Sequence, residues 1–368
     1  MMDDGKGSGG ALSVQKGIAQ PPSVNPEVLR NLGNRRRKAY TADEFVEGIF
    51  SGDRTILSQA ITLVESSLPR HYELAQEVIE RCLPASSRSI RVGITGVPGA
   101  GKSTFIDTFG TMLTHHYGRR LAVLAIDPSS QHSHGSIMGD KTRMERLSTD
   151  PDAFIRPSPS AGTLGGVARK TNESAILCEA AGFDTILIET VGVGQSETAA
   201  HSMVDFFLVL MIAGAGDELQ GIKRGIMEMA DTIAITKADG NNIQKADLAR
   251  TDYANALHLF PLPPSGWSPK VLTCSSLEEK GIIDIWSTIV DYVSFTKGNG
   301  YFWERRRQQV VTRMHETIVD SLKYSFYSNT EVMAAMQQIE SQLREGTITS
   351  YKAASVLLEK YFSKIHIT

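Results

Sequence analysis

A glycine-rich octapeptide that contains one lysine and one serine follows a short apolar run. Residues 96–103 read Gly-Val-Pro-Gly-Ala-Gly-Lys-Ser, and the apolar run is Ile90–Ile94. Glycines let a backbone approach an anion closely, and the N–H groups at the start of a following helix point toward it. Lys102 would reach the β- and γ-phosphates of a nucleotide, and the Ser103 hydroxyl would ligate Mg²⁺. The pattern predicts a P-loop that binds a nucleoside triphosphate, because a glycine turn without a ligand rarely lies between a strand and a helix.

The tetrapeptide Thr236-Lys237-Ala238-Asp239 follows another apolar run, where guanine-binding proteins carry Asn-Lys-x-Asp. The Asp239 carboxylate can accept hydrogen bonds from N1–H and the 2-amino group of guanine, and adenine offers neither donor there. Lys237 can lay its aliphatic stem across the base. Thr236 replaces the usual Asn and leaves only a hydroxyl. A second loop, Cys274-Ser275-Ser276-Leu277, could offer backbone N–H groups to the guanine oxygen. The sequence therefore favours GTP, with a surface turn as the alternative.

A third segment reads Glu189-Thr190-Val191-Gly192-Val193-Gly194-Gln195-Ser196 and follows the apolar run 185–188. An acid at a strand tip opposite a P-loop usually orients a Mg²⁺-bound water, and Gly192 would let its amide reach the γ-phosphate. Gln195 does not directly follow that glycine. We therefore expect it to position the attacking water less efficiently than the glutamine of fast-switching GTPases does.

Two aspartates between these segments are candidates for the metal shell. Asp127 ends the apolar run 121–126, and Asp140 follows within Gly139-Asp140-Lys141-Thr142. A structural role for one of the two is the alternative. His132 and His134 lie nearby, but no cysteine or further histidine completes a metal site, so we expect them to be solvated.

Composition limits the class of protein. The chain has 368 residues, 41% of them hydrophobic and 21% charged, as in soluble globular proteins of one large domain or two. The net charge of −3 argues against nucleic acid as the main partner. The three cysteines, Cys82, Cys178 and Cys274, are too far apart to indicate a disulfide framework or a metal site. We find no membrane span and no signal-peptide core, so we expect a cytoplasmic protein.

Apolar runs and helical spacing alternate through the middle of the chain. This alternation predicts an α/β fold with a doubly wound, mostly parallel sheet, and the ligand should bind at the carboxyl ends of the strands. The expected strands are Ile90–Ile94, Leu121–Ile126, Thr185–Glu189, Phe206–Met211, Thr232–Thr236 and Val271–Thr273.

The remaining parts are expected to extend this core. Residues 1–40 are rich in Gly, Ser, Pro and Asn and suggest a disordered arm, and residues 41–86 suggest a helical module. The GTPase domain would span 87–298. Residues 299–368 show three helical patterns, with Ser350 as the expected cap of the last. An oligomerisation or partner arm is one interpretation of these helices, and packing back on the domain is the other.

With these segments in order, the chain resembles the GTPases that accompany adenosylcobalamin-dependent methylmalonyl-CoA mutase. That family includes the methylmalonic aciduria type A protein and bacterial proteins once labelled arginine/ornithine transport kinases. The resemblance covers about residues 42–365. Its most specific stretches are residues 127–130, 139–144, 189–197 and 216–223.

The resemblance implies a homodimeric GTPase of the metallochaperone-type P-loop class, which gates cofactor loading and protects or reactivates the mutase. The implied phosphate-binding residues are Gly96, Val97, Pro98, Gly99, Ala100, Gly101, Lys102, Ser103 and Thr104. Ser103, Asp127, Asp140 and Glu189 would surround Mg²⁺. Residues 214–223 would form a further switch that responds to the mutase. The helices of 299–368 would be the dimerisation arm. Family members use Asn or Thr at position 236.

The partner mutase would hold the cobalamin. The chain lacks the Asp-x-His-x-x-Gly pattern expected of a protein that ligates cobalamin through a histidine, so we expect no cobalamin bound directly. The expected catalytic groups are Lys102, Glu189, Gln195 and, when the mutase docks, Lys223. A solvated lysine at a helix start is the alternative for Lys223.

Two other functions compete with this one. An ATP-dependent kinase of an arginine/ornithine transport system is the first alternative, but Asp239 favours GTP over ATP. A nickel-type metallochaperone GTPase is the second, and it lacks the His- or Cys-rich tract it would need.

Overall fold

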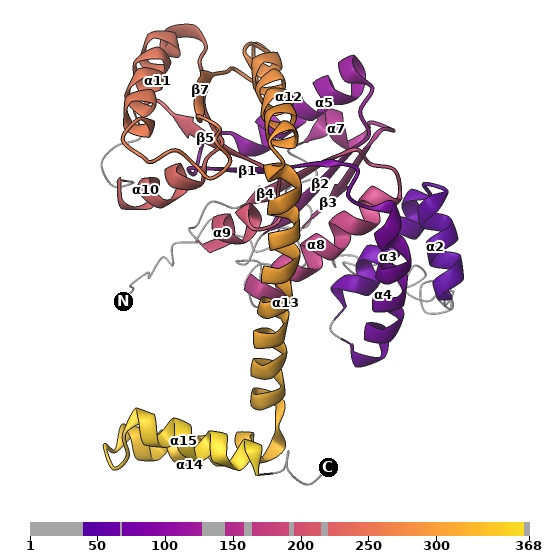
Figure 1. Ribbon diagram of the computed structural model, residues 1–368, viewed down its shortest axis with the longest axis vertical. Helices are drawn as coiled ribbons and strands as arrows, with labels where there is room; N and C mark the ends of the chain where they lie inside the picture. Colours follow the sequence, from indigo (N-terminus) through magenta and orange to yellow (C-terminus); the bar gives the residue numbers. More distant parts are fainter. Residues whose placement is uncertain are drawn as a thin grey trace, which may run out of the picture. The chain divides into compact units, whose positions relative to one another are not determined.

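Seven parallel strands form one sheet in the computed structural model, which describes residues 40–66, 68–126, 144–157, 164–190, 195–214 and 220–363. The strand order is β3-β2-β4-β1-β5-β6-β7 (Figure 1). Most of the strands are buried along nearly their whole length, as expected for a parallel sheet covered on both faces. The strands are β1 Ile90–Gly96, β2 Leu121–Ile126, β3 Ala153–Arg156, β4 Thr185–Thr190, β5 Phe206–Ile212, β6 Thr232–Thr236 and β7 Lys270–Thr273.

The strand order reverses direction around β1. From β1 the chain moves outward to β2 and β3, returns to β4 on one side of β1, and continues to β5 on the other. Ile94 is in register with Glu189 of β4, and Gly96 with Leu210 of β5. The ends of these three strands therefore meet at the switch point, where open α/β sheets bind their ligands.

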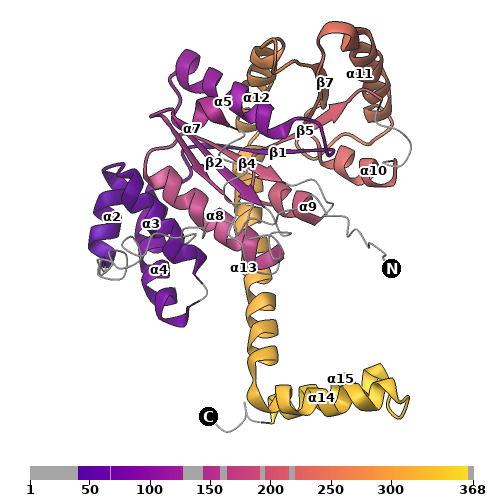
Figure 2. The ribbon, with the colours of Figure 1, turned by 180° about the vertical axis from the view of Figure 1, so that it is seen from behind.

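Helices cover both faces of the sheet. In Figures 1 and 2, α5 and α12 lie above the sheet, and α8 and α9 lie below it. The predicted doubly wound α/β fold with helical extensions is confirmed, and every described strand pair is parallel. The helices that follow the strands are α5 Lys102–Tyr117, α7 Glu145–Ser148, α8 Leu164–Ala180, α9 Gln195–His201, α10 Gln220–Met229, α11 Ile243–Leu257 and α12 Ile282–Gly298.

All six expected strands are present, and one strand was missed. The missed strand is β3, which lies at the edge of the sheet and pairs only with β2. It has four residues, and its last two are only half-buried. So short a run at an edge carries little hydrophobic pattern, and its pairing partner, rather than its own sequence, makes it a strand.

Among the described residues, three helices precede the sheet: α2 Ala42–Phe50, α3 Arg54–Glu65 and α4 Pro69–Cys82. A short 3₁₀ helix, η1 Leu83–Ala85, leads on to β1. The Asp53 side chain caps α3, since its carboxylate accepts hydrogen bonds from the N–H groups of Thr55 and Ile56 at 2.7 and 3.1 Å. Both α3 and α4 pack on α8, which itself packs on the sheet, so this helical group covers α8.

Three more helices end the chain: α13 Tyr301–Ser328, α14 Thr330–Arg344 and α15 Ser350–Phe362. The last two form a hairpin around Val332, Ile339, Ala353 and Leu357. The expectation that Ser350 caps α15 is wrong, because Ser350 is already helical and the Thr349 hydroxyl accepts from the Lys352 N–H. No helix in the described ranges has both the length and the apolarity that a bilayer span requires.

Arginines anchor the start of α13 to the sheet. Arg306 binds both oxygens of the Asp205 carboxylate, at 2.7 and 2.6 Å, and donates to the carbonyls of Ser87 and Ser89. Gln309 donates to the Val204 carbonyl at 2.8 Å. Planar, bidentate arginine contacts of this kind fix geometry as well as charge, so α13 is held in a defined direction.

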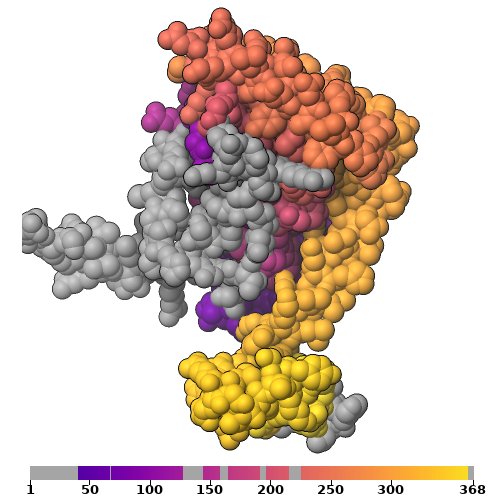
Figure 3. Space-filling view, turned by 90° about the vertical axis from the view of Figure 1, so that its left-hand side faces the viewer, coloured from indigo at the N-terminus to yellow at the C-terminus, as the bar shows by residue number. Residues whose placement is uncertain are grey.

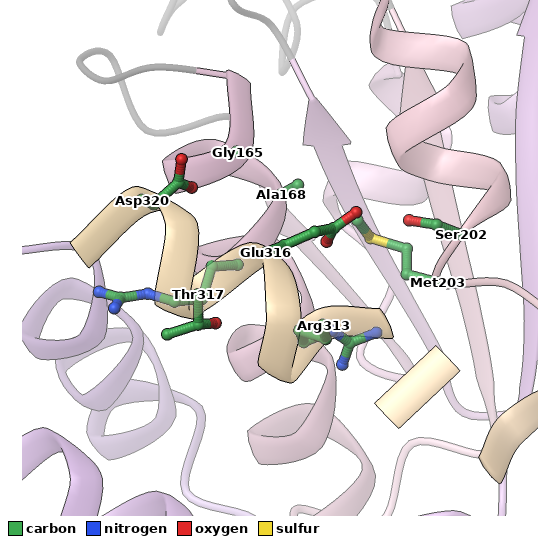
Figure 4. Close-up of a pocket in the computed structure, with 9 residues that line it drawn as sticks. Gly165, Ala168, Ser202, Met203, Arg313, Glu316, Thr317 and Asp320 are labelled. Atoms are coloured by element: carbon green, nitrogen blue, oxygen red, sulfur yellow. The ribbon is translucent and has the colours of Figure 1, made fainter. Parts of the chain in front are cut away.

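Further along, α13 lines a small polar pocket with α8 and the end of α9 (Figure 4). Asp320 lies against Gly165, where an added Cβ would be 2.3 Å from its Oδ2 atom. The lining residues are Gly165, Ala168, Arg169, Ser202, Met203, Arg313, Glu316, Thr317 and Asp320. None of them belongs to the predicted nucleotide site, so the pocket is a feature of the helix junction.

A buried ion pair links β1 to α8. Arg91 donates from Nε and Nη2 to the two oxygens of Glu179, each at 2.8 Å. The Ser87 N–H and the Ser89 hydroxyl also donate to this carboxylate. Burial alone raises the pKa of Glu179, but the Arg91 guanidinium and these hydrogen bonds outweigh it and hold the pKa below its usual range.

We predict that Glu179→Ala strongly destabilises the fold. The substitution leaves the Arg91 charge buried without its partner, which costs about 3–5 kcal/mol in comparable cases. Urea denaturation of the two proteins would measure the difference. Glu304→Ala is the control, because its ion pair with Arg307 is exposed and should contribute under about 1 kcal/mol. Similar losses in both variants would contradict the prediction.

Candidate nucleotide-binding site

The loop between β1 and α5 depends on glycine at three positions. A Cβ on Gly96 would lie 2.3 Å from the Leu210 carbonyl oxygen of β5, so no larger residue fits there. Gly99 and Gly101 have φ angles of +79° and +81°, in the left-handed region. Gly101 is also the N-cap of α5 and offers no side chain of its own. The backbone N–H groups at the start of α5 are thus open to an anion.

The Lys102 side chain folds back over the loop. Its ammonium donates to the Gly96 carbonyl oxygen at 2.9 Å. Burial lowers the pKa of Lys102, while the nearby carboxylates of Glu189 and Glu197 act in the opposite direction. The positive charge is therefore held over the loop, in the place a P-loop lysine needs for the β- and γ-phosphates.

Ser103 and Glu189 meet opposite the loop. The Ser103 hydroxyl donates to Glu189 Oε1 at 3.3 Å, and Glu189 lies near the end of β4, beside β1. These are hard oxygen donors of the kind that Mg²⁺ prefers, and Mg²⁺ commonly uses one or two protein ligands with phosphates and waters. Among the described residues no group of three or more His, Cys, Asp and Glu forms a metal cage. The pair suits a magnesium ion that the nucleotide helps to bind.

Thr236 joins the P-loop to the centre of the sheet. Its buried hydroxyl lies 2.8 Å from the Ala100 carbonyl oxygen and 3.0 Å from that of Met211 on β5. One hydroxyl proton can serve only one of these acceptors at a time. Thr236 stands where guanine-binding proteins carry Asn, and its hydroxyl thus makes a contact within the protein that supports the P-loop.

Asp239 is held by the second base-side loop. Its Oδ2 atom accepts a hydrogen bond of 2.5 Å from the Ser275 hydroxyl. The Ala238 N–H donates to the Cys274 carbonyl at 3.0 Å, so the two loops are tied together. Lys237 adopts a positive φ of 57°, and its Cε atom lies 4.0 Å from the place of a Cβ on Gly101. This arrangement orients a carboxylate and a lysine stem beside the P-loop.

The Ser275 amide is already used within the protein. Its N–H donates to the Lys280 carbonyl at 2.9 Å, so this group is not available to a guanine oxygen. The Ser276 carbonyl accepts from Thr108 of α5 at 3.2 Å, and Leu277 is 83% exposed. The backbone N–H groups of Ser276 and Leu277 remain candidates for the base.

Other predicted residues divide into those the structure describes and those it does not. Val97 and Ala100 are buried and support the loop, whereas Pro98 and Thr104 are exposed. Asp127, Asp140 and Gly192 lie outside the described residues. Gln195 begins α9 and Lys223 lies in α10, but their side chains also lie outside the description.

One acidic residue near the site was not predicted from the sequence. Glu197 of α9 is fully buried, and its charge acts on Lys102. In the sequence Glu197 precedes Thr198-Ala199-Ala200, and an acid ahead of small residues is the pattern that could have marked it. That signal is weak, because the same pattern suits a solvated helix face.

The comparison with protein families agrees with this geometry. The profile described as methylmalonyl Co-A mutase-associated GTPase MeaB matches residues 57–331, about three quarters of the chain. The chain belongs to the MeaB family.

Relatives of known sequence and structure extend the comparison. The "Probable GTPase" of Mycobacterium tuberculosis is 47% identical over 87% of this chain and 95% of its own. The "Methylmalonic aciduria type A homolog, mitochondrial" of Mus musculus is 44% identical over 88% of this chain and 80% of its own. A crystal structure of the LAO/AO transport system kinase is similar at 36% identity with a TM-score of 0.69, covering 86% of this chain and 96% of that one. These matches agree with a P-loop GTPase fold.

We predict that Asp239→Asn weakens GTP binding by about 1–3 kcal/mol. The amide of Asn keeps one acceptor oxygen but replaces the other with an N–H donor, which leaves one of the two guanine donors unpaired. Calorimetric titration with GTP and ATP would measure the effect, and ATP affinity should not fall. Asp247→Asn on α11 is the control, since Asp247 pairs only with the exposed Arg250 on its own helix. Equal GTP affinity in Asp239→Asn and the unmodified protein would refute the base assignment.

Proposed function

We propose that this protein is a GTPase chaperone of an adenosylcobalamin-dependent acyl-CoA mutase. Within that class, methylmalonyl-CoA mutase is the partner we propose. The observation that carries the proposal is a P-loop joined to an oriented Asp239, in a chain of the MeaB family. GTP hydrolysis would gate cofactor loading and would protect or reactivate the mutase. Cobalamin would stay with the partner, and the GTPase would act in the cytoplasm.

Each residue of the site has its own role in the binding and hydrolysis of GTP. Lys102 and the loop backbone bind the β- and γ-phosphates and neutralise charge that develops during transfer. Ser103 and Glu189 would hold Mg²⁺, with Asp127 and Asp140 proposed for the same shell, and the ion would supply further neutralisation of the phosphates. Gly192 would contact the γ-phosphate. Asp239 selects guanine.

Hydrolysis by the isolated protein should be slow. In the sequence Gln195 does not directly follow Gly192, so a group brought in by the partner would complete the site. Lys223 of α10 is our candidate for that group. Its helix follows β5, the neighbour of β1, and Leu210 of β5 is in register with Gly96, so Lys223 belongs to the segment that follows a strand adjoining the P-loop.

We predict that the mutase accelerates GTP hydrolysis roughly 10- to 100-fold, and that Lys223→Ala removes this stimulation but keeps the slow basal rate. Phosphate release would be measured for both proteins with and without purified methylmalonyl-CoA mutase. Lys102→Ala is the negative control and should show no turnover. Stimulation that survives in Lys223→Ala would exclude that residue. No stimulation of the unmodified protein would refute the chaperone proposal for this mutase.

We also propose that residues 299–368 form a dimerisation arm, next to a GTPase domain over 87–298 and a helical module over 41–86. Val310, Met314, Ile318 and Leu322 of α13 are each about half-exposed or more. At 3.6 residues per turn they cover about 120° of the helix surface, away from the positions that face α8. Figure 3 shows the outer surface of α13 in orange, above the α14–α15 hairpin in yellow. One apolar stripe can pair with its own copy across a two-fold axis.

We predict that Met314→Glu shifts the protein toward a monomer, because a charge in an apolar interface must be desolvated. Light scattering after gel filtration would give the mass. Lys323→Glu, on the same helix but off the stripe, should leave the mass unchanged. A monomeric unmodified protein would refute the arm as a dimer contact.

One alternative has an observation in its favour. The similar crystal structure bears the name of a LAO/AO transport system kinase. Transfer of the γ-phosphoryl group from ATP to a periplasmic arginine- or ornithine-binding protein would support that function. We expect no transfer, since the Asp239 carboxylate has no donor to accept from on adenine.

A further inference from the structure

Glu197 is a carboxylate whose surroundings in the described residues do not satisfy it. The residue is fully buried, and its Oε2 atom accepts from the Ser196 hydroxyl at 3.2 Å. Its Oε1 atom has no hydrogen-bond partner in the described part of the chain. A buried oxygen without a partner on an ionisable group is destabilising, so it requires an explanation such as a bound ion, a ligand or a role in the site.

The position of α9 explains which groups this oxygen can serve. The helix packs against β1 and β4, the two strands that lead to the P-loop and to Glu189. Below the loop these strands are joined by the buried pair of Thr95 and Thr190, whose hydroxyls are 2.7 Å apart. Helix α9, which carries Glu197, lies on the face of the sheet opposite α5 (Figures 1 and 2).

Lys102 carries a positive charge at the P-loop end of the sheet, the phosphate edge. Its ammonium has three N–H groups, one of which donates to Gly96. Glu189 and Glu197 are the two carboxylates whose charges act on it. Within the described residues, two carboxylates thus act on Lys102, and a polyphosphate bound by this lysine meets both charges.

We propose that Glu197 is a positioning residue that acts as the counter-ion of Lys102 in the nucleotide-free protein and makes tight nucleotide binding depend on Mg²⁺. The carboxylate competes with the phosphates for the lysine. It also repels them through space until a divalent cation offsets the charge. This inference rests on the proposed function for the identity of the ligand, a guanine nucleotide.

The test compares GDP binding to the unmodified protein and to Glu197→Gln, with Mg²⁺ and with EDTA. The amide keeps the shape of the side chain and an acceptor for Ser196. We expect Glu197→Gln to bind GDP about three- to tenfold more tightly in EDTA, as removal of one nearby charge implies, and to gain less in Mg²⁺. Glu173→Gln is the matched control: its half-buried carboxylate accepts from Gln76 on α4, and the substitution changes the net charge equally.

Each outcome decides the inference. Unchanged or weaker GDP binding by Glu197→Gln in EDTA would overturn it, as would an equal gain in Glu173→Gln. Glu197→Gln should fold, because Glu189 remains to act on Lys102. Failure of this variant to fold would overturn the inference. If the unmodified protein binds no guanine nucleotide in Mg²⁺, the proposed function itself fails, whereas normal binding with no effect of Glu197→Gln defeats only the role of Glu197.

Discussion

The close packing of Gly96 against the Leu210 carbonyl sets the geometry of this molecule. A parallel sheet buried on both faces leaves its functional groups only at the strand ends, and β1 ends where the strand order reverses. With no Cβ at Gly96, the chain can turn beside β5 and direct the N–H groups of α5 at an anion. The register then brings Glu189 from β4, and Thr236 from β6 reaches the same loop. The P-loop, Glu189 and Thr236 are therefore brought together at this junction.

Charge is distributed in two different ways around that junction. Away from the carboxyl edge, buried charges are matched: Arg91 with Glu179, and Arg306 with Asp205. Such pairs fix the direction of α8 and α13 relative to the sheet, since breaking one leaves an uncompensated buried charge. At the phosphate edge the balance is unequal, with Lys102 facing Glu189 and Glu197. Protein charges that are unbalanced without a ligand are typical of a site that is completed by one.

The arrangement of α9 joins the two regions. Its first residues follow the segment that carries Gly192, and its end lies against α13, where Arg305 approaches the His201 carbonyl at 3.4 Å and Gln309 binds Val204. A short helix thus contacts both the strands that lead to the P-loop and the proposed dimer arm.

Local chemistry in the sequence determined much of this protein. The P-loop, Asp239 and six of the seven strands follow from glycine positions, one carboxylate and apolar runs, because these signals act over a few neighbouring residues. Only the tertiary structure decided which segments that are far apart in the sequence come into contact. The Ser275 hydroxyl meets Asp239, the Thr236 hydroxyl meets the P-loop, β3 becomes a strand beside β2, and the charge of Glu197 acts on Lys102. These partners lie from about thirty to more than a hundred residues apart, and no local pattern specifies which distant groups a fold brings together.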